Sequence, residues 1–544
     1  MRHVKTPAAA ILLGSAIFAL AEKPNVLLIC VDDLKPALGC YGDTIAKTPQ
    51  IDRLALRSTL FGRAYCNQAV CAPSRNALIT GLRPDTLGIY DLETNFRKVA
   101  PDAVTMPQVF MKAGYRTQAL GKILHTGHGN SEDAASWSME PWKPKAPQFA
   151  LPESTSTMKE GKNGARGAAT ESAEVADDFY ADGKIADEAI ARLKAAAGKP
   201  DEAFFLAVGF MKPHLPFVAP KKYWDLYERG EMPLAEFREV PKDAPPYALQ
   251  FGGELRQYSD VPDVTVLPDD YQRLLIHGYY AATSYVDAQI GRVIDALDAS
   301  GLSGNTIIVL WGDHGWHLGD HGMWCKHTNY EQAARIPLMI AKAGAKQGEG
   351  KRSDAFVETV DLFPTLCAMA GLAPAAGIDG TDIFAALSDP SAGTMDHAIH
   401  VYPRGGRLGR AIRTGNYRMV EWKVPGADPE TAEYELYDCL RDPLEKENIA
   451  AKNPEMLLGM KEILARYPEA KPQFRAKGGK PATRQKPKQD RGAMFDSRDA
   501  NKDGRLTMGE FLSRQPDGDD ARPRFQKFDR DGDGFLSREE FVKP

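Results

Sequence analysis

The chain has 544 residues, a formal net charge of -5 at neutral pH and 26% charged residues, with both signs mixed along the sequence. This length is too great for one compact domain and predicts two or three folded units. Because the charge is mixed and its net value is small, no global field favours nucleic acid, and we expect no nucleic-acid partner.

Residues 1–21 have the pattern of a secretory signal peptide. Basic residues between positions 2 and 5 precede an apolar run from Ala8 to Leu20, and Ala19-Leu20-Ala21 is a small-x-small cleavage site. The run is too short to cross a bilayer comfortably, which disfavours the alternative of an uncleaved membrane anchor. We therefore expect an exported protein, periplasmic or extracellular, without stable membrane insertion.

Short apolar runs alternate with helical patterns through the first 395 residues. The runs are partly β-branched, as buried strands are, and comprise Asn25–Val31, Thr117–Leu120, Ala203–Val208 and Thr306–Trp311. Helical periodicity is found at Tyr279–Leu297 and Phe356–Gly371. The alternation predicts an α/β fold, a mixed sheet flanked by helices, over residues 22–395.

The pattern changes after residue 395. Strand patterns at Arg410–Trp422 and Glu435–Asp442, then a helical pattern at Pro454–Tyr467, indicate a smaller α+β subdomain over residues 396–470. Residues 471–491 are basic, contain Pro and Gly, and have almost no apolar side chains. We expect a solvated linker there, and contact with an anionic polymer is the alternative.

Polar side chains follow each predicted strand of the first domain. They are Asp32 and Asp33 after the first strand, Lys122 and His125 after the second, Lys212 and His214 after the third, and Asp313, His314 and Lys326 after the fourth. In open α/β sheets, ligands bind at the carboxyl ends of the strands. We therefore expect these side chains to converge at one edge of the sheet.

The acidic members of this group suit a metal ion. Asp32, Asp33 and Asp313 offer hard oxygen ligands of the kind that Ca²⁺ prefers. Adjacent carboxylates at the end of a buried strand repel each other unless a cation neutralises them. The alternative is that Asp32 caps a turn and Asp33 is solvated.

The basic members suit an oxyanion with several equivalent oxygens. Arg75, Lys122 and Lys326 beside a metal would bind sulfate or phosphate. His125 and His214 titrate near neutrality and could transfer protons. Four further histidines have weaker cases and would line the site at most: His128, His317, His321 and His327.

Cys71 begins the pentapeptide Cys71-Ala72-Pro73-Ser74-Arg75. Pro73 suits the first turn of a helix running to Ile79, which would put Cys71 at the N-terminal end, where negative charge is favoured. A buried core thiol and half of a disulfide with Cys66 are the alternatives. Spacing leaves disulfide pairing open among the seven cysteines: Cys30, Cys40, Cys66, Cys71, Cys325, Cys367 and Cys439.

These motifs together resemble the formylglycine-dependent sulfatases of the alkaline-phosphatase superfamily, over most of residues 24–450. The resemblance rests on CAPSRNALITGLRP from Cys71, GKILH from Gly121, GFMKPHLPF from Gly209 and GDHGWHLGDHG from Gly312. The third motif and the Asp-His pair of the fourth are most similar to the iduronate-2-sulfatase branch.

The resemblance implies a nucleophile and a metal site. Cys71 would be oxidised by a maturation enzyme to formylglycine (3-oxoalanine), whose hydrate would attack sulfur, with Arg75 stabilising that hydrate. One active-site Ca²⁺ would be held by the formylglycine oxygen together with Asp32, Asp33, Asp313 and His314.

The resemblance also implies roles for the lysines and histidines. Lys122 and Lys326 would grip the sulfate, His214 would protonate the leaving oxygen, and His125 would help to deprotonate the second hydroxyl so that sulfate departs. The implied substrate is a sulfated glycan, with a 2-O-sulfated uronic acid or a related sugar. The same fold hosts phosphate and phosphonate ester hydrolases, which stay an alternative, as does a non-catalytic, calcium-dependent glycan-binding protein.

Residues 492–544 contain two calcium-loop patterns of the form D-x-N/D-x-D-G-x5-E. The acidic and amide positions are Asp499, Asn501, Asp503 and Glu510 in the first loop, and Asp529, Asp531, Asp533 and Glu540 in the second. Each loop has the glycine that the sharp turn requires. We expect a helical EF-hand pair with two Ca²⁺ rather than a dockerin-like module or an acidic tail. The sequence indicates no partner for it.

Overall fold

The computed structural model describes residues 23–156, 166–250, 252–264, 266–392, 395–475, 491–499, 501–512 and 522–542. The predicted signal peptide lies outside these residues, as does most of the predicted basic linker. Among the described residues, no helix combines the length and the apolar character needed to cross a membrane.

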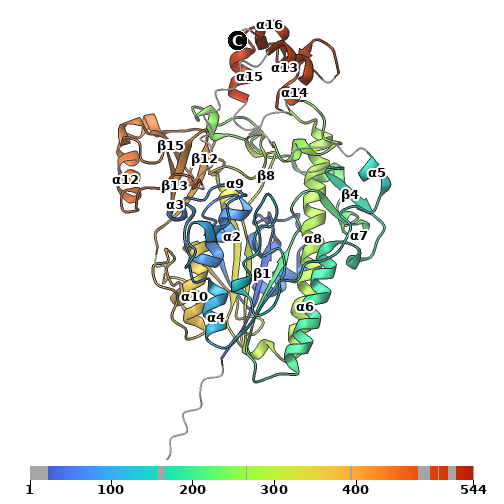
Figure 1. Ribbon diagram of the computed structural model, residues 1–544, viewed down its shortest axis with the longest axis vertical. Helices are drawn as coiled ribbons and strands as arrows, with labels where there is room; N and C mark the ends of the chain where they lie inside the picture. The colour runs from blue at the N-terminus through green and yellow to red at the C-terminus, as the bar shows by residue number, and fades with distance from the viewer. Residues whose placement is uncertain are drawn as a thin grey trace, which may run out of the picture.

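A seven-stranded sheet forms the centre of the first domain (Figure 1). In spatial order its strands are β11 (Lys351–Glu358), β2 (Thr59–Tyr65), β10 (Arg335–Ala341), β7 (Thr306–Gly312), β1 (Asn25–Val31), β5 (Phe204–Phe210) and β3 (Arg116–Gly121). Strand β10 is antiparallel to both of its neighbours, and the other pairings are parallel. The predicted mixed sheet is confirmed.

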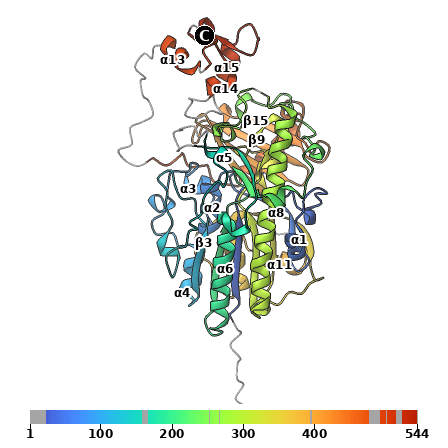
Figure 2. The same cartoon turned by 90° about the vertical axis from the view of Figure 1, so that its right-hand side faces the viewer.

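Helices cover both faces of the sheet (Figure 2). One face is covered by α1 (Pro49–Ala55), α6 (Ala181–Ala197) and α8 (Asp269–Ala299), and the other by α2 (Cys71–Thr80), α4 (Met106–Lys112) and α10 (Leu362–Met369). Strand β1 is buried on both sides: Leu27 and Ile29 pack with the first set, and Val26 and Leu28 with the second. Burial on both faces explains its continuous apolar sequence.

The predicted helix Phe356–Gly371 begins too early in the sequence. Residues 356–358 are the end of β11, and α10 begins only at Leu362 after a short 3₁₀ turn at Thr359–Asp361. The backbone N–H of Glu358 donates to the Asp361 carboxylate (2.7 Å), as one half of a reciprocal cap. This cap fixes the change from strand to helix, which hydrophobic periodicity alone does not reveal.

Shorter elements connect these layers. The helices are α3 (Pro84–Leu87), α5 (Pro152–Ser156), α7 (Lys221–Trp224), α9 (Glu331–Ala334) and α11 (Phe384–Ser388). The strands are β4 (Thr170–Ala173), β6 (Phe217–Pro220), β8 (His317–Leu318) and β9 (Trp324–Cys325). Strands β8 and β9 pair with each other and precede the loop that carries Lys326.

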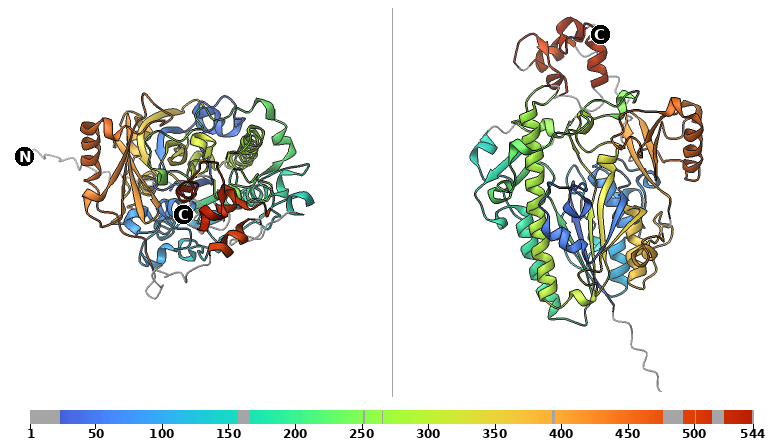
Figure 3. Two further views of the ribbon diagram at one scale, coloured as in Figure 1. Left: turned by 90° about the horizontal axis from the view of Figure 1, so that it is seen from above. Right: turned by 180° about the vertical axis from the view of Figure 1, so that it is seen from behind.

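A second, antiparallel sheet stands beside the first domain (Figure 3). Its strands are β12 (His397–Arg404), β13 (Arg407–Thr414), β14 (Tyr417–Lys423) and β15 (Glu433–Asp438). Helix α12 (Pro454–Leu464) packs on one face through Met460 and Leu464. This is the smaller α+β subdomain predicted from the sequence. Residues 471–474, at the start of the predicted linker, hydrogen-bond to the segment around Gly88 and Tyr90.

The C-terminal helices form the red module at the top of Figure 1. They are α13 (Arg491–Arg498), α14 (Met508–Leu512), α15 (Arg522–Phe528) and α16 (Arg538–Val542), with β16 (Arg505–Leu506) and β17 (Leu536–Ser537) between them. The two short strands pair antiparallel, which joins the two calcium loops. A small core of seven buried side chains holds the module: Phe495, Leu506, Met508, Phe511, Phe525, Leu536 and Phe541.

Candidate active site

The sheet brings the predicted polar side chains together at the carboxyl ends of its parallel strands. Asp32 follows β1, Lys122 follows β3, His214 lies four residues after β5, and Asp313 follows β7. Strand β2 leads to the same edge and delivers Cys71 as the first residue of α2. Convergence of this kind is what an open α/β sheet imposes on residues at strand ends.

Three buried aspartates form the floor of the site. Asp32, Asp33 and Asp313 are each at most 1% exposed, and the backbone N–H of Asp33 donates to Oδ1 of Asp313 (2.9 Å). Burial raises the pKa of Asp33 and of Asp313. Burial acts in the same sense on Asp32, but Lys122 and Arg75 outweigh it and hold the pKa of Asp32 well below its ordinary value.

Arg75 lies under this cluster and is fully buried. Its Nε donates to Asp313 Oδ2 (2.9 Å) and its Nη2 to Asp32 Oδ1 (3.0 Å), and the carbonyl of Lys122 accepts from Nη1. A guanidinium can donate in two directions at fixed angles, so Arg75 sets the separation of the two carboxylates.

Both acidic and basic side chains surround the Cys71 thiol. Its Sγ lies 3.4 Å from Nε2 of His314, 3.6 Å from Nζ of Lys122 and 4.0 Å from Oδ1 of Asp33. Burial and Asp32 raise the pKa of the Cys71 thiol, but Lys122 and Lys326 oppose them and the pKa lies below its ordinary value. The site therefore favours a reactive, charged group at this position.

All seven cysteines lie in the described part of the chain, and each is a free thiol. Cys71 and Cys66 are therefore not bonded to each other in this structure.

The two lysines contact different aspartates of the cluster. Nζ of Lys122 donates to Asp32, whereas Nζ of Lys326 lies 3.0 and 3.1 Å from the two carboxylate oxygens of Asp33. Lys326 is only 3% exposed and sits 5.0 Å from the ring centroid of Trp316. Two ammonium groups in the cluster around one buried thiol could bind an anion with several oxygens.

Glu254 is a site residue that the sequence did not reveal. Its Oε2 lies 3.0 Å from Nζ of Lys326, and its Oε1 lies 3.2 Å from Nε2 of His214. Burial raises the pKa of Glu254, but Lys326 and His214 outweigh it and the pKa is well below its ordinary value. Glu254 lies in a loop between β6 and α8 without regular periodicity, so no sequence pattern marked it.

The two predicted proton-transfer histidines lie in different surroundings. Nδ1 of His214 donates to the carbonyl of Leu215 (2.6 Å), so Nε2 faces Glu254 and Asp33. Nε2 of His125 lies 3.1 Å from Nδ1 of His128. Among the described residues, no hydrogen bond joins His125 to Cys71. Burial and Lys122 lower the pKa of His125 to about 3, which keeps its ring neutral.

The other predicted candidates have structural roles. Nζ of Lys212 donates to the carbonyls of His214 (2.7 Å) and Pro216 (2.6 Å), and thereby fixes the loop after β5. His317 is fully buried and pairs with the Thr328 hydroxyl (2.9 Å).

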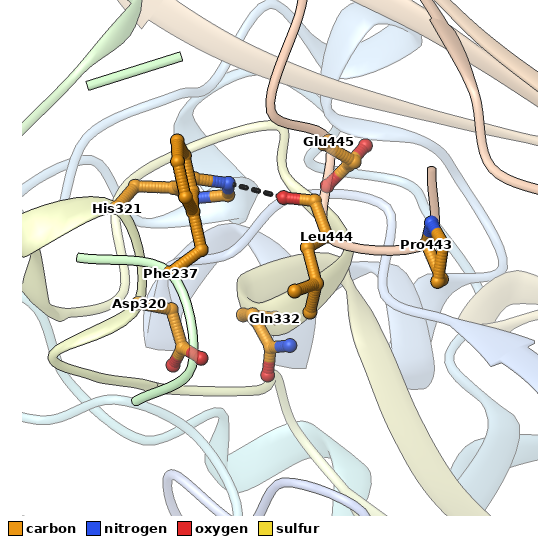
Figure 4. Close-up of a pocket in the computed structure, with 7 residues that line it drawn as sticks. All are labelled: Phe237, Asp320, His321, Gln332, Pro443, Leu444 and Glu445. Carbon is orange, nitrogen blue, oxygen red and sulfur yellow. Dashed lines mark hydrogen bonds between the residues drawn. The ribbon is translucent and has the colours of Figure 1, made fainter. Parts of the chain in front are cut away.

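His321 belongs to a pocket on the subdomain boundary. Figure 4 shows its Nε2 donating to the carbonyl of Leu444 (2.6 Å), with Phe237 and Glu445 nearby. These residues join the loop after β8 to the loop after β15 and do not include any member of the aspartate cluster. His321 is thus a packing residue rather than part of the site around Cys71.

The donor set around Cys71 fits a divalent metal ion. Ligand atoms of Asp32, Asp33, Cys71 and His214 lie within 4.8 Å of one another, and so do those of Cys71, Asp313 and His314. Several buried carboxylates in one cluster repel each other, and the raised pKa values of Asp33 and Asp313 express that cost. A hard cation bound by these oxygens would relieve it.

The C-terminal loops have the geometry of EF hands. The backbone N–H of Gly504 donates to Asp499 (2.9 Å), and that of Gly534 donates to Asp529 (3.0 Å). Both glycines have positive φ, +80° and +83°, which the sharp loop requires and which other residues adopt only under strain. In the second loop, ligand atoms of Asp529, Asp531 and Glu540 come within 4.8 Å of one another.

Comparison with known families identifies the fold. The family model described as "Sulfatase" matches residues 24–372, which is more than half of the chain. The chain belongs to the sulfatase family. Within this sulfatase, the model "N-sulphoglucosamine sulphohydrolase, C-terminal" matches residues 319–468, and the model "EF hand" matches residues 522–543, the second predicted loop.

Individual relatives agree with this assignment. The sulfatase is 38% identical over 407 residues to mouse iduronate 2-sulfatase, covering 66% of this chain and 73% of that protein. Phosphonate monoester hydrolase of Agrobacterium radiobacter shares its fold, with a TM-score of 0.67 at 23% identity, covering 81% and 95% of the two chains. A 2-O GAG sulfatase also shares the fold, with a TM-score of 0.61 at 24% identity, covering 82% and 92%.

Proposed function

We propose that this sulfatase hydrolyses sulfate esters of a glycan, and that the substrate sugar is a 2-O-sulfated uronic acid. One observation carries the proposal: the buried Cys71 thiol faces Lys122 on one side and the aspartate cluster with His314 on the other. The similarity to iduronate 2-sulfatase supports the choice of sugar.

We assign sulfate binding to the two lysines. Nζ of Lys122 lies 3.6 Å from Sγ of Cys71, and Nζ of Lys326 contacts the carboxylate of Asp33. Both would contact non-bridging sulfate oxygens, because ammonium groups in a buried site stabilise the charge that develops there. Arg75, held between Asp32 and Asp313, would keep the floor of the site rigid while the ester is bound.

Cys71 is assigned as the precursor of the nucleophile. Converted to formylglycine, it would supply a geminal diol, in which one hydroxyl attacks sulfur and the other allows sulfate to be expelled. Its place at the N-terminal end of α2 suits either a charged nucleophile or an anionic substrate.

Proton transfer is assigned to the two histidines. Nδ1 of His214 is already hydrogen-bonded to the carbonyl of Leu215. We therefore assign proton donation to Nε2, which would donate to the leaving oxygen of the sugar. The ring of His125 is neutral, because burial and Lys122 lower its pKa, and it would accept a proton in the step that releases sulfate.

We further propose that the metal is Ca²⁺, held by Asp32, Asp33, Asp313 and His314 with the oxygen at position 71, and that it offsets the negative charge of this cluster. Two more Ca²⁺ would occupy the C-terminal loops. The proposed organisation is a cleaved signal peptide at 1–21 for export, a catalytic domain at 22–395, a subdomain at 396–470, a linker at 471–491 and an EF-hand pair at 492–544.

Mass spectrometry of the peptide that contains Cys71 tests the proposal directly. The protein is expressed with a formylglycine-generating maturation enzyme, and we expect the mass change of a thiol replaced by an aldehyde. The converted protein should release sulfate from a disaccharide ending in a 2-O-sulfated uronic acid faster than from one with only a 6-O-sulfate. Cys71→Ser should show neither the mass change nor the release of sulfate. Hydrolysis of phosphate or phosphonate esters faster than of sulfate esters would contradict the proposal.

A further inference from the structure

Arg404 stands apart from the other buried arginines described outside the C-terminal helical module. Five of them have a carboxylate within 4.0 Å, namely Arg57, Arg75, Arg410, Arg413 and Arg418. Arg404 is 7% exposed, yet no carboxylate lies within that distance of it among the described residues. A guanidinium keeps its charge, so a buried one without an anion is costly.

The guanidinium of Arg404 is only partly satisfied. Its Nη2 donates to the carbonyl of His327 and its Nη1 donates weakly to that of Pro403 (3.3 Å), whereas its buried Nε has no hydrogen-bond partner. The guanidinium also stacks on the ring of Tyr402, 4.3 Å from the centroid. Donors that stay available on a preorganised, stacked guanidinium are what a planar anion needs.

Arg404 lies next to the proposed sulfate site. The carbonyl that it bonds belongs to His327, and His327 directly follows Lys326. The charges of Lys326, Glu254 and Arg404 all act on the half-buried His327 ring, which also lies 6.1 Å from the Tyr402 ring. The arginine of the second sheet and Lys326 of the first domain are therefore both close enough to affect the same imidazole.

We infer that Arg404, stacked on Tyr402 and beside His327, forms a carboxylate subsite that binds the uronate group of the substrate. The inference rests on the proposed function, because a uronic acid carries its sulfate ester and its carboxylate on the same ring. With the ester at Lys326, the carboxylate of that ring needs a second cation nearby, and Arg404, at the end of strand β12, is bonded to the carbonyl of the residue that follows Lys326.

Arg407 provides a matched control on the same hairpin. It pairs with Arg404 in the β12–β13 register, and its Nη2 lies 3.2 Å from Glu433. Its side chain is 40% exposed, so its charge is solvated and already paired. Arg407 is thus an arginine on the same hairpin as Arg404, but it is more exposed and is already paired with a carboxylate.

Binding of methyl glucuronide and of methyl glucoside to the full-length protein, measured by calorimetry in calcium buffer, tests the subsite without turnover. The two ligands differ only in the carboxylate. We expect the wild type and Arg407→Gln to prefer the glucuronide by about 10- to 100-fold, the range for one charge-assisted hydrogen-bonded pair. Arg404→Gln should abolish this preference, and Arg404→Lys should restore part of it.

Equal binding of the two glycosides by the wild type, or a preference that survives in Arg404→Gln, would overturn the inference. Sulfate release is measured separately on the 2-O-sulfated uronate disaccharide and on its carboxyl-reduced form. Arg404→Gln should lower the ratio of their kcat/KM values by the same factor as the binding preference. If the converted wild type releases no sulfate, the proposed function fails while the binding result still decides the subsite.

Discussion

Oε2 of Glu254 lies 3.0 Å from Nζ of Lys326, so a carboxylate is bound to the lysine that we assign to the sulfate. The same carboxylate reaches Nε2 of His214 through its other oxygen. Glu254 therefore connects the lysine that we assign to sulfate with the proposed leaving-group acid. On this assignment, the substrate sulfate would share Lys326 with two carboxylates, Glu254 and Asp33.

Glu254→Gln removes this charge while keeping the shape of the side chain. We expect a lower KM, because Lys326 loses a competing anion, and a kcat lowered about 10-fold or more, because His214 loses the partner that orients Nε2. The loss of kcat should be larger for a sugar sulfate than for an aryl sulfate, whose leaving group needs little protonation. Steady-state kinetics on both esters measure the split.

Glu239→Gln is the control, since Glu239 is exposed in the same connection between β6 and α8. Its kinetics should match the wild type. If Glu254→Gln changes both esters equally and leaves KM unaltered, Glu254 has a packing role only.

Arg75→Ala should destabilise the fold as well as abolish activity. Arg75 is fully buried between Asp32 and Asp313, and breaking a buried pair leaves uncompensated charge at a cost of about 3–5 kcal/mol. Thermal unfolding in calcium buffer should show a large drop in Tm. Arg53→Ala is the control: its pair with Asp295 is 40% and 61% exposed, and its loss should cost at most about 1 kcal/mol. Equal drops would show that Arg75 does not support the cluster.

Asp287 makes the stability of the fold depend on pH. This buried carboxyl of α8 accepts from the backbone N–H groups of Ile51 (2.7 Å) and Gln50 (3.1 Å) at the start of α1. Burial raises the pKa of Asp287 to about 7. The folded state thus holds the proton more tightly than the unfolded state, so the stabilisation is complete below about pH 4 and is lost as the pH rises through 7.

Asp287→Asn mimics the protonated carboxyl at every pH. We expect Tm of the wild type to fall more steeply than Tm of Asp287→Asn between about pH 4 and 8. Asp295→Asn, an exposed change on the same helix, should keep the wild-type slope. A slope shared by all three proteins would show that burial of Asp287 does not set it.

Most of the catalytic edge could be predicted because strand ends are visible in sequence. Strand β1 is a continuous apolar run that ends at Asp32, and β7 ends in the same way at Asp313. Strand β10 escaped prediction because Pro337 interrupts it at a bulge. Glu254 contacts Lys326 and Arg404 contacts His327, but one comes from a loop and the other from a second sheet, so only the tertiary arrangement puts them there.

The C-terminal loops should contribute calcium sites that are independent of catalysis. Glu510 and Glu540 are the last ligand positions of the two loops, and each accepts a bond within its own loop, from Thr507 (2.9 Å) and Ser537 (2.9 Å). Replacing both glutamates by glutamine removes the bidentate ligand that such loops need. Metal analysis after equilibrium dialysis should show two fewer Ca²⁺ per chain than in the wild type, with kcat on an aryl sulfate unchanged.

A chain truncated after Arg475 should behave in the same way, because it keeps the bonds of residues 471–474 to the catalytic domain. Truncation after Lys471 is the informative contrast. It removes Gln473, whose side chain accepts from the backbone N–H of Tyr90 (2.8 Å), and should lower Tm. If the glutamine variant or the longer truncation loses turnover, the EF-hand module is part of the catalytic unit and our assignment of its two calcium sites as separate is wrong.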